Sequence, residues 1–265
     1  MNKLFDMTGK VVAITGGAGN LGKTMTRTLL DAGAKVAVIG RTDRLGDEFA
    51  DFRAAGRLAF LQFDLAEKGG AEAAMDAVAA TFGGLDVLVN NAAYGGGAGG
   101  KSCEFRLDRI DDDTWQTGID GTLGVTFRCT RAAIPYLEKR GGGAIVNIGS
   151  MYGLVSPDFA IYGKDIPWSP PTYGAGKAGV LQFTRYCAAA LAAKNIRVNS
   201  LTPGPFPNVT PKSDMAFIGR LSAKTMMGRT GRAEELSGAL LLLCSDASSF
   251  MTGSNIVVDG GMTAW

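Results

Sequence analysis

A tyrosine and a lysine four residues apart, Tyr173 and Lys177, are the side chains of this sequence best suited to move a proton. If the segment "TYGAGKAGVLQFTRY" is a helix, both side chains project from one face of it. A free tyrosine has a pKa of about 10, so proton transfer near neutral pH needs a positive charge that stabilises the phenolate. Lys177 can supply that charge, and Ser150 would donate a hydrogen bond to the substrate oxygen. The same spacing is common on ordinary helix surfaces, so by itself it gives a hypothesis rather than an assignment.

The sequence contains no histidine, which excludes much of the familiar proton-transfer and metal chemistry. Ser/His/Asp triads, Cys/His pairs and HExxH zinc helices all require an imidazole. Any proton must therefore move through tyrosine, lysine, cysteine or a carboxylate. The cysteines are scattered without CxxC spacing, so we expect no metal site and interpret them as reduced, mostly structural thiols. They are Cys103, Cys129, Cys187 and Cys244.

Length and charge indicate a single globular domain over residues 1–265. The chain has 27 lysines and arginines against 25 acidic residues, a formal net charge of +2, which gives no electrostatic signature of a nucleic-acid or anionic-membrane partner. The first residues, "MNKLFDMTGK", lack the apolar core of a signal peptide, and the apolar run "GALLLLC" at 238–244 is too short to span a bilayer. We therefore expect a soluble, cytoplasmic protein whose partner is a small-molecule substrate.

The elements that must position these residues alternate along the chain. Short apolar runs predict buried strands at 10–17, 34–40, 57–64, 85–92, 143–150, 196–204 and 255–261. Stretches with helical spacing predict helices over 21–32, 70–82, 114–137, 173–193 and 233–245. This alternation is typical of an α/β fold with a doubly wound parallel sheet, in which ligands bind at the carboxyl ends of the strands. Four unusual sequences fall at those ends: "TGGAGNLG", "NNAA", "GS" and "TPGPF".

The glycine-rich turn "TGGAGNLG" lies between the first predicted strand and the first predicted helix. Its glycines, at 16, 17, 19 and 22, let backbone N–H groups and the helix N-terminus approach a pyrophosphate without Cβ atoms in the way. A tight strand-to-helix turn can also need glycine for its conformation alone. At this place in an alternating chain, the turn favours dinucleotide binding.

The end of the second predicted strand, "VIGRT", bears on which dinucleotide is bound. Folds that choose NAD usually carry an acidic residue there, whereas this chain has Gly40, followed by Arg41 and Thr42, with Arg44 close by. These side chains could hold a 2′-phosphate, so we expect NADP rather than NAD. The alternative is that Arg41 stacks on the adenine face, which either cofactor permits. Asp64, which ends the third strand, would accept a hydrogen bond from the adenine amino group or, alternatively, cap the next helix.

With these motifs in this order, followed by "YGAGK", "IRVNSLTPG" and "SDASSFMTGSNIVVDGG", the chain resembles the short-chain dehydrogenase/reductase family over essentially its full length. The resemblance implies a Rossmann fold, an NAD(P) cofactor, hydride transfer to or from the nicotinamide, and a homotetramer or homodimer. It makes Tyr173 the general acid/base, Lys177 its pKa partner and ribose contact, and Ser150 the polarising donor. The cofactor-binding residues predicted in this way are Gly16, Gly19, Asn20, Leu21, Gly22, Arg41, Thr42, Asp64, Leu65, Asn91, Ala92, Tyr173, Lys177, Pro203, Gly204 and Phe206.

Three features depart from the compact, single-domain members of that family. The glycine turn has the spacing TGxxGxxG, and Ser150 and Tyr173 are 23 residues apart, both of which are typical of extended, nucleotide-sugar-modifying members. Thr122 stands where many members have a catalytic asparagine. Two alternatives follow, a nucleotide-sugar epimerase or dehydratase and a cofactor-binding protein without turnover. The chain stops at Trp265, as compact members do, and it keeps Ser150, Tyr173 and Lys177. We therefore expect an enzyme that transfers a hydride between NAD(P) and a secondary alcohol or ketone.

The insert between Ser150 and Tyr173, residues 151–171, is expected to form a lid over the substrate. Its aromatic side chains and prolines suit a polyhydroxylated ring such as a sugar or sugar acid, or another small polar molecule. The alternative is that the aromatic residues simply pack the loop onto the protein. A second substrate-covering stretch is expected at 205–228. The candidate substrate contacts are Ser150, Tyr152, Tyr162 and Trp168.

Overall fold

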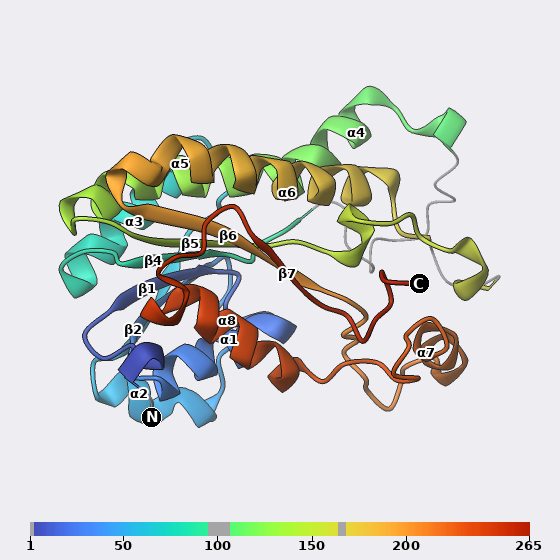
Figure 1. The fold of residues 1–265 in the computed structure, drawn as a ribbon, viewed down its shortest axis with the longest axis horizontal. Helices are drawn as coiled ribbons and strands as arrows, with labels where there is room; N and C mark the ends of the chain where they lie inside the picture. Colours follow the sequence, from blue (N-terminus) through green and yellow to red (C-terminus); the bar gives the residue numbers. More distant parts are fainter. Residues whose placement is uncertain (1–2, 95–106, 164–167) are drawn as a thin grey trace.

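A single parallel sheet of seven strands forms the centre of the computed structural model, which describes residues 3–94, 107–163 and 168–265 (Figure 1). The strands, β1 to β7 in chain order, span Val11–Thr15, Lys35–Gly40, Leu58–Gln62, Val87–Asn90, Gly143–Ile148, Ile196–Pro203 and Asn255–Val258. Their order in the sheet is β3-β2-β1-β4-β5-β6-β7, and all neighbouring strands are parallel. The order changes direction between β1 and β4, which is where open α/β sheets bind ligands. The predicted doubly wound Rossmann fold is confirmed.

Helices cover both faces of this sheet, with α1, α2 and α8 on one face and α3, α5 and α6 on the other (Figure 1). The sequence patterns did not predict α2, whose five residues are too few to establish a helical repeat, nor α7, which lies in the stretch at 205–228 that was expected to cover the substrate. Within the described ranges, no helix is both long and apolar enough to cross a membrane. The helices are α1 Asn20–Asp31, α2 Ala50–Ala54, α3 Gly70–Phe82, α4 Asp112–Ile119, α5 Val125–Lys139, α6 Pro171–Leu191, α7 Met215–Ser222 and α8 Ser237–Cys244.

Two hydrophobic cores, one on each face of the sheet, explain why the strands are continuous apolar runs. In β1, Val12 and Ile14 belong to one core together with Leu29 of α1. Val11 and Ala13 belong to the other core, which contains the buried side chains of α3 and α5. Successive side chains of a strand point to opposite faces, so a strand that is covered on both faces must be apolar at every position.

The predicted helix over 114–137 is in fact three segments, because α4 and α5 are joined by a π-helical turn at Asp120–Gly124. A π turn inserts a residue into a helix and changes the pattern of its backbone hydrogen bonds. Here the Gly121 carbonyl oxygen accepts a hydrogen bond from the N–H of Tyr94, 2.9 Å away, in the loop after β4. The amphipathic repeat continues across the turn, which is why the sequence pattern shows one long helix.

The π-helical turn packs closely against α6 at Gly176. A Cβ atom added at Gly176 would lie 1.8 Å from the hydroxyl oxygen of Thr122, and both residues are buried. This contact sets the distance between the turn and the helix that carries Tyr173 and Lys177.

We expect Gly176→Ala to lower the free energy of unfolding by about 1–3 kcal/mol, the usual cost of overpacking, although alanine is the better helix former. Thr122→Ala removes the opposing hydroxyl and should recover most of that loss in the double variant. Urea unfolding of the wild type, both single variants and the double variant measures the coupling. If the two single effects simply add, the residues do not share this contact.

Candidate active site

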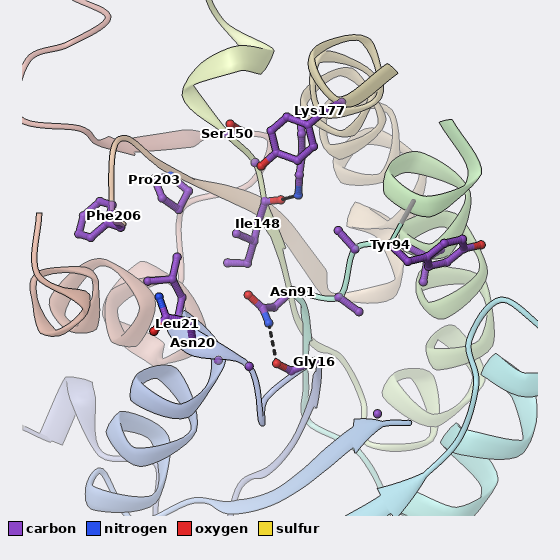
Figure 2. A pocket seen from close by; sticks show the side chains of 18 of the residues that line it. Gly16, Asn20, Leu21, Asn91, Tyr94, Ile148, Ser150, Lys177, Pro203 and Phe206 are labelled. Atoms are coloured by element: carbon purple, nitrogen blue, oxygen red, sulfur yellow. Dashed lines mark hydrogen bonds between the residues drawn. The ribbon is translucent and has the colours of Figure 1, made fainter. Parts of the chain in front are cut away.

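A cleft of about 690 Å³ opens at the carboxyl ends of the strands. Residues at or just beyond the ends of β1 to β6 line it, so that segments from Gly16 to Leu221 meet in one place. Figure 2 shows this arrangement, with Asn20 and Leu21 on one side and Ser150 and Lys177 across the cleft from them. All of the predicted cofactor-binding residues line the cleft, although their contacts with a cofactor remain predictions.

The glycine turn after β1 forms a cradle that side chains would fill. Gly16 has a φ of +65°, a conformation that favours glycine, and a Cβ atom at Gly22 would lie 2.2 Å from the Gly16 carbonyl oxygen. The first turn of α1 carries no acidic residue, and Asn20 and Leu21 in that turn line the cleft. The backbone N–H groups of a helix N-terminus attract anions, so this cradle fits a pyrophosphate.

The side chain of Asn91 joins this turn to the end of β4. Its amide nitrogen donates to the carbonyl oxygens of Thr15 and Gly16, each at 3.1 Å (Figure 2). In return, the Thr15 hydroxyl oxygen accepts from the backbone N–H groups of Asn91 and Ala92, at 3.0 and 2.9 Å. These four bonds hold the two strand ends at the switch point in a fixed relative position.

The exposed residues Arg41, Thr42 and Arg44 line the other end of the cleft, beyond β2. A Cβ atom at Gly40 would meet the ring of Phe60 at 3.7 Å, an ordinary contact, so packing does not require glycine there. The Asp64 carboxylate lines the cleft and accepts a hydrogen bond from the N–H of Ala66 at 2.9 Å, within the turn after β3. It does not cap the next helix, α3, whose N-cap position is Gly69, so the alternative role predicted for Asp64 is wrong.

Ser150, Tyr173 and Lys177 are brought together by β5 and α6. Ser150 follows β5, is buried, and caps the short 3-10 helix that begins at Met151. The Lys177 ammonium group lies 5.9 Å from the centre of the Tyr173 ring. It donates a hydrogen bond of 2.6 Å to the carbonyl oxygen of Ile148, the last residue of β5 (Figure 2). The spacing of Tyr173 and Lys177 therefore belongs to a cleft and not to an ordinary helix surface.

Burial determines the protonation of this pair. It raises the pKa of the Tyr173 phenol, and a hydrogen bond from the Ser150 hydroxyl opposes that effect. Burial also lowers the pKa of the Lys177 ammonium group to about 8. Because the phenol is neutral in this environment, its use as a base requires positive charge to be brought into the cleft.

Thr122, which the family resemblance placed at the position of a catalytic asparagine, does not line the cleft. Its hydroxyl donates to the carbonyl oxygens of Gly118 and Ile119, at 3.1 and 3.2 Å, within its own helix. Thr122 is buried, so its hydroxyl serves the backbone of the π-helical turn.

A half-buried cluster of Tyr94, Asp120 and Arg128 lies beside the cleft and was missed by the sequence analysis. Tyr94 lines the cleft, and its hydroxyl donates to the Asp120 carboxylate. Arg128 donates to the same carboxylate, lowering its pKa, and to the carbonyl oxygen of Leu65 at 3.1 Å. The cluster fastens the loops after β3 and β4 to the π-helical turn. Its position directly after "NNAA" is the feature of the sequence that could have placed Tyr94 at the cleft.

The insert brings two of its predicted substrate contacts to the cleft and leaves one outside. Tyr152 and Tyr162 line the cleft, and their hydroxyl oxygens are 3.0 Å apart. Trp168 does not line it. Its ring stacks on Phe159, with the centroids 4.4 Å apart, and it is 42% exposed. Part of the predicted lid, residues 164–167, falls outside the described ranges.

Helix α7 completes the cover over this end of the cleft. The ring of Phe217 lies 5.8 Å from the ring of Tyr162, and Leu221 packs beside them. Arg220 donates to the Ile161 carbonyl oxygen at 2.6 Å, and the Lys224 ammonium group is 2.6 Å from the Asp158 carboxylate. Phe217 and Leu221 line the cleft but were not singled out from the sequence, although their spacing of four residues places both on one helix face.

The chain is similar to known proteins over nearly its whole length. A family model described as enoyl-(acyl carrier protein) reductase matches residues 16–263. A cis-4-hydroxycyclohexanecarboxylate dehydrogenase of Sinomonas cyclohexanicum is 34% identical over 260 residues, covering 96% of this chain and 97% of that protein. A cyclopentanol dehydrogenase of Comamonas testosteroni is 36% identical over 265 residues, with coverage of 96% and 97%. A gluconate 5-dehydrogenase from Burkholderia cenocepacia, crystallised with NADP and tartrate, is 30% identical with a TM-score of 0.85, covering 99% of this chain and 98% of that one.

The lowered pKa of Lys177 predicts a rise in stability with pH. Between pH 8 and the ordinary value of 10.5, the unfolded chain keeps a proton that the folded protein has lost, so the free energy of unfolding increases with pH. Lys177→Met lacks this titration. We expect the difference in unfolding free energy, wild type minus variant, to rise from pH 7.5 to 10 in urea titrations without cofactor. A flat difference would show that Lys177 is not held in a desolvated site.

Proposed function

Because the chain belongs to the short-chain dehydrogenase/reductase family, we propose that Tyr173 is the general acid/base of its cleft, with Lys177 and Ser150 as partners. The chain is an NAD(P)-dependent oxidoreductase that interconverts secondary alcohols and ketones. The single observation that carries the proposal is the placement of Lys177 beneath the Tyr173 ring, beside Ser150, in the cleft that also holds the glycine cradle.

The proton steps follow from the geometry. The nicotinamide ring, when bound, accepts a hydride from the alcohol carbon or supplies one to the ketone carbon. Ser150 donates a hydrogen bond to the substrate oxygen, which orients it and polarises its bond to carbon. During oxidation the Tyr173 oxygen takes the hydroxyl proton, and during reduction it returns that proton to the oxygen. The Lys177 ammonium group would favour the phenolate by its charge, together with the positive charge of the oxidised nicotinamide when that cofactor is bound.

The cleft residues support a definite orientation for the cofactor. The pyrophosphate would bind at the cradle of Gly16, Gly19 and Gly22, and Asn91, Ala92 and Lys177 would hold the nicotinamide ribose. Pro203, Gly204 and Phe206 would lie against the nicotinamide. Asp64 and Leu65 would contact the adenine.

The exposed arginines favour NADP over NAD. The 2′-phosphate would be bound by Arg41, Thr42 and Arg44. Position 40 is a glycine, so no carboxylate is present there to accept a hydrogen bond from the 2′-hydroxyl of NAD. The gluconate 5-dehydrogenase was crystallised with NADP and a short-chain dehydrogenase from Leptospira borgpetersenii with NAD+, so the preference for NADP rests on the arginines.

Two other functions suggested by the sequence have less support. An epimerase or dehydratase acting on a nucleotide sugar was motivated by the spacing of the glycines and of Ser150 and Tyr173, yet the relatives described above are dehydrogenases. A protein without turnover was motivated by Thr122, whose hydroxyl lies outside the cleft, while Ser150, Tyr173 and Lys177 all line it. A sugar or sugar acid, as suggested by the sequence, would fall within the oxidoreductase assignment, and the lack of a cation at the substrate end among the described residues favours the neutral sugar.

We also propose that the enzyme is a homotetramer or homodimer. The outer faces of α5 and α6 carry large exposed side chains, with Phe127 44% and Tyr186 70% exposed. Phe250, before β7, is fully exposed. Apolar surface of this kind is commonly covered by another copy of the chain.

A cytoplasmic location remains a prediction, and the state of the described cysteines supports it. Cys129, Cys187 and Cys244 are buried free thiols, and burial raises the pKa of each one. Thiols of this kind are unreactive and structural, as proposed from the sequence. Cys103 lies outside the described residues.

Replacing the proposed acid/base tests the function. Tyr173→Phe removes the transferable proton and keeps the ring, so turnover of a secondary alcohol should fall by on the order of 100-fold or more. The change should leave the dissociation constant of NADP within a few-fold of the wild-type value. Nicotinamide absorbance measures turnover, and equilibrium fluorescence measures binding. Near-full activity in the variant would remove Tyr173 from the mechanism.

The cofactor preference is tested at the end of β2. Arg41→Ala should weaken NADP by roughly 1.5–3 kcal/mol, the range for a hydrogen bond to a charged group, with little effect on NAD. Gly40→Asp has room for its Cβ atom and should favour NAD, because its carboxylate repels the 2′-phosphate and accepts from the 2′-hydroxyl.

Gly40→Asn is the matched control for that experiment, since it has the same shape without the charge. Dissociation constants for both cofactors should show a smaller change of preference in Gly40→Asn than in Gly40→Asp. A wild-type protein that binds NAD more tightly than NADP would contradict the assignment, and equal losses of both cofactors in Arg41→Ala would favour stacking on the adenine.

A further inference from the structure

The substrate end of the cleft contains two tyrosines that the proton chemistry does not use. We define this end by Tyr152, Tyr162, Ser169, Phe217 and Leu221, all of which line the cleft. Tyr162 is 3% exposed and Tyr152 is half-buried. Burial raises the pKa of both phenols, so each keeps its hydroxyl proton at neutral pH.

The hydrogen bonds of this pair leave one proton for a ligand. Tyr162 donates to the Tyr152 oxygen at 3.0 Å. Two phenols have two protons, and the bond between them uses one. Within the described residues, the Tyr152 proton has no acceptor other than what enters the cleft, and a half-buried hydroxyl is costly to leave unpaired.

The rest of the substrate end is uncharged. Its other side chains are the apolar Phe217 and Leu221, which suit the carbon skeleton of a ring. Among described residues, the charged side chains that line the cleft are Arg41, Arg44 and Asp64 at the adenosine end and Lys177 beneath Tyr173. The nearby Arg220 is directed to the Ile161 carbonyl oxygen and does not line the cleft. No cation of the described residues is therefore placed to pair with a carboxylate on the substrate.

We propose that the substrate is a neutral ring alcohol, or its ketone, that carries a second oxygen, and that the Tyr152 hydroxyl donates to this oxygen. The proposal rests on the oxidoreductase function proposed for the cleft. Tyr152 then acts as a specificity determinant: the ring is held against Phe217 and Leu221, its reacting oxygen lies at Ser150 and Tyr173, and its second oxygen is identified by Tyr152. The hydrogen bond from Tyr162 fixes the orientation of the Tyr152 hydroxyl.

The experiment compares cyclohexanol with the 1,2-, 1,3- and 1,4-cyclohexanediols and with 4-hydroxycyclohexanecarboxylate. In the wild type, kcat/KM with NADP should be higher for at least one diol than for cyclohexanol, and lowest for the carboxylate. In Tyr152→Phe the ratio of the best diol to cyclohexanol should fall by about 2- to 12-fold, the loss of one neutral hydrogen bond. Tyr136→Phe, which removes a hydroxyl that contacts Asp76 outside the cleft, is the matched control and should keep the wild-type ratio.

A binding measurement separates this proposal from the proposed function. Calorimetry in the presence of NADPH, with which an alcohol cannot react, gives dissociation constants for the same compounds without turnover. If oxidation is observed but Tyr152→Phe keeps the wild-type ratio, or if the carboxylate is the best substrate, the inference about Tyr152 is overturned. If no alcohol is oxidised and yet the binding ratio falls in Tyr152→Phe, the inference stands and the proposed function fails.

Discussion

The burial of the Lys177 ammonium group beneath Tyr173 is the constraint on which the rest of the site depends. A buried ammonium group needs a hydrogen-bond acceptor, and the carbonyl oxygen of Ile148 at the end of β5 provides one. That bond fixes α6 against β5. Close packing of the π-helical turn on Gly176 fixes the other side of α6, so the tyrosine and the lysine are held between two rigid elements. The protonation of Tyr173 then depends on the ligand that binds in the cleft, because burial keeps the phenol neutral in its absence.

The cofactor end of the cleft could be predicted from the sequence because it is built from strand ends. Each strand is an apolar run covered on both faces, and the residues that follow parallel strands all lie at the same edge of the sheet. Gly16, Asn91 and Ser150 could therefore be located without knowing any tertiary contact. The substrate end could not be predicted in the same way. Trp168 turns out to stack on Phe159 outside the cleft, which is a choice of partner that the residue types alone do not reveal.

The π-helical turn shows a different limit of sequence reasoning. Its amphipathic pattern continues that of α4 and α5, so periodicity cannot detect it, yet it determines where the Gly121 carbonyl oxygen meets Tyr94. Thr122 is informative in this respect. As a substitute for asparagine it suggested a defect in catalysis, whereas in the structure its hydroxyl bonds to the carbonyl oxygens of its own helix and its side chain packs on Gly176.

The lining of the cleft by residues from six different strand ends has a consequence for folding. Parallel neighbours are joined by crossovers, so the contacts that close the cleft connect residues far apart in the chain, and such topologies fold slowly. A partly folded chain has no complete dinucleotide site, and the cofactor therefore binds the native state alone. By mass action, a cofactor concentration 100 times its dissociation constant adds about 2.7 kcal/mol to the free energy of unfolding. The nicotinamide nucleotide is thus a reactant of the enzyme and, at the same time, a ligand that shifts the folding equilibrium of the chain toward its native state.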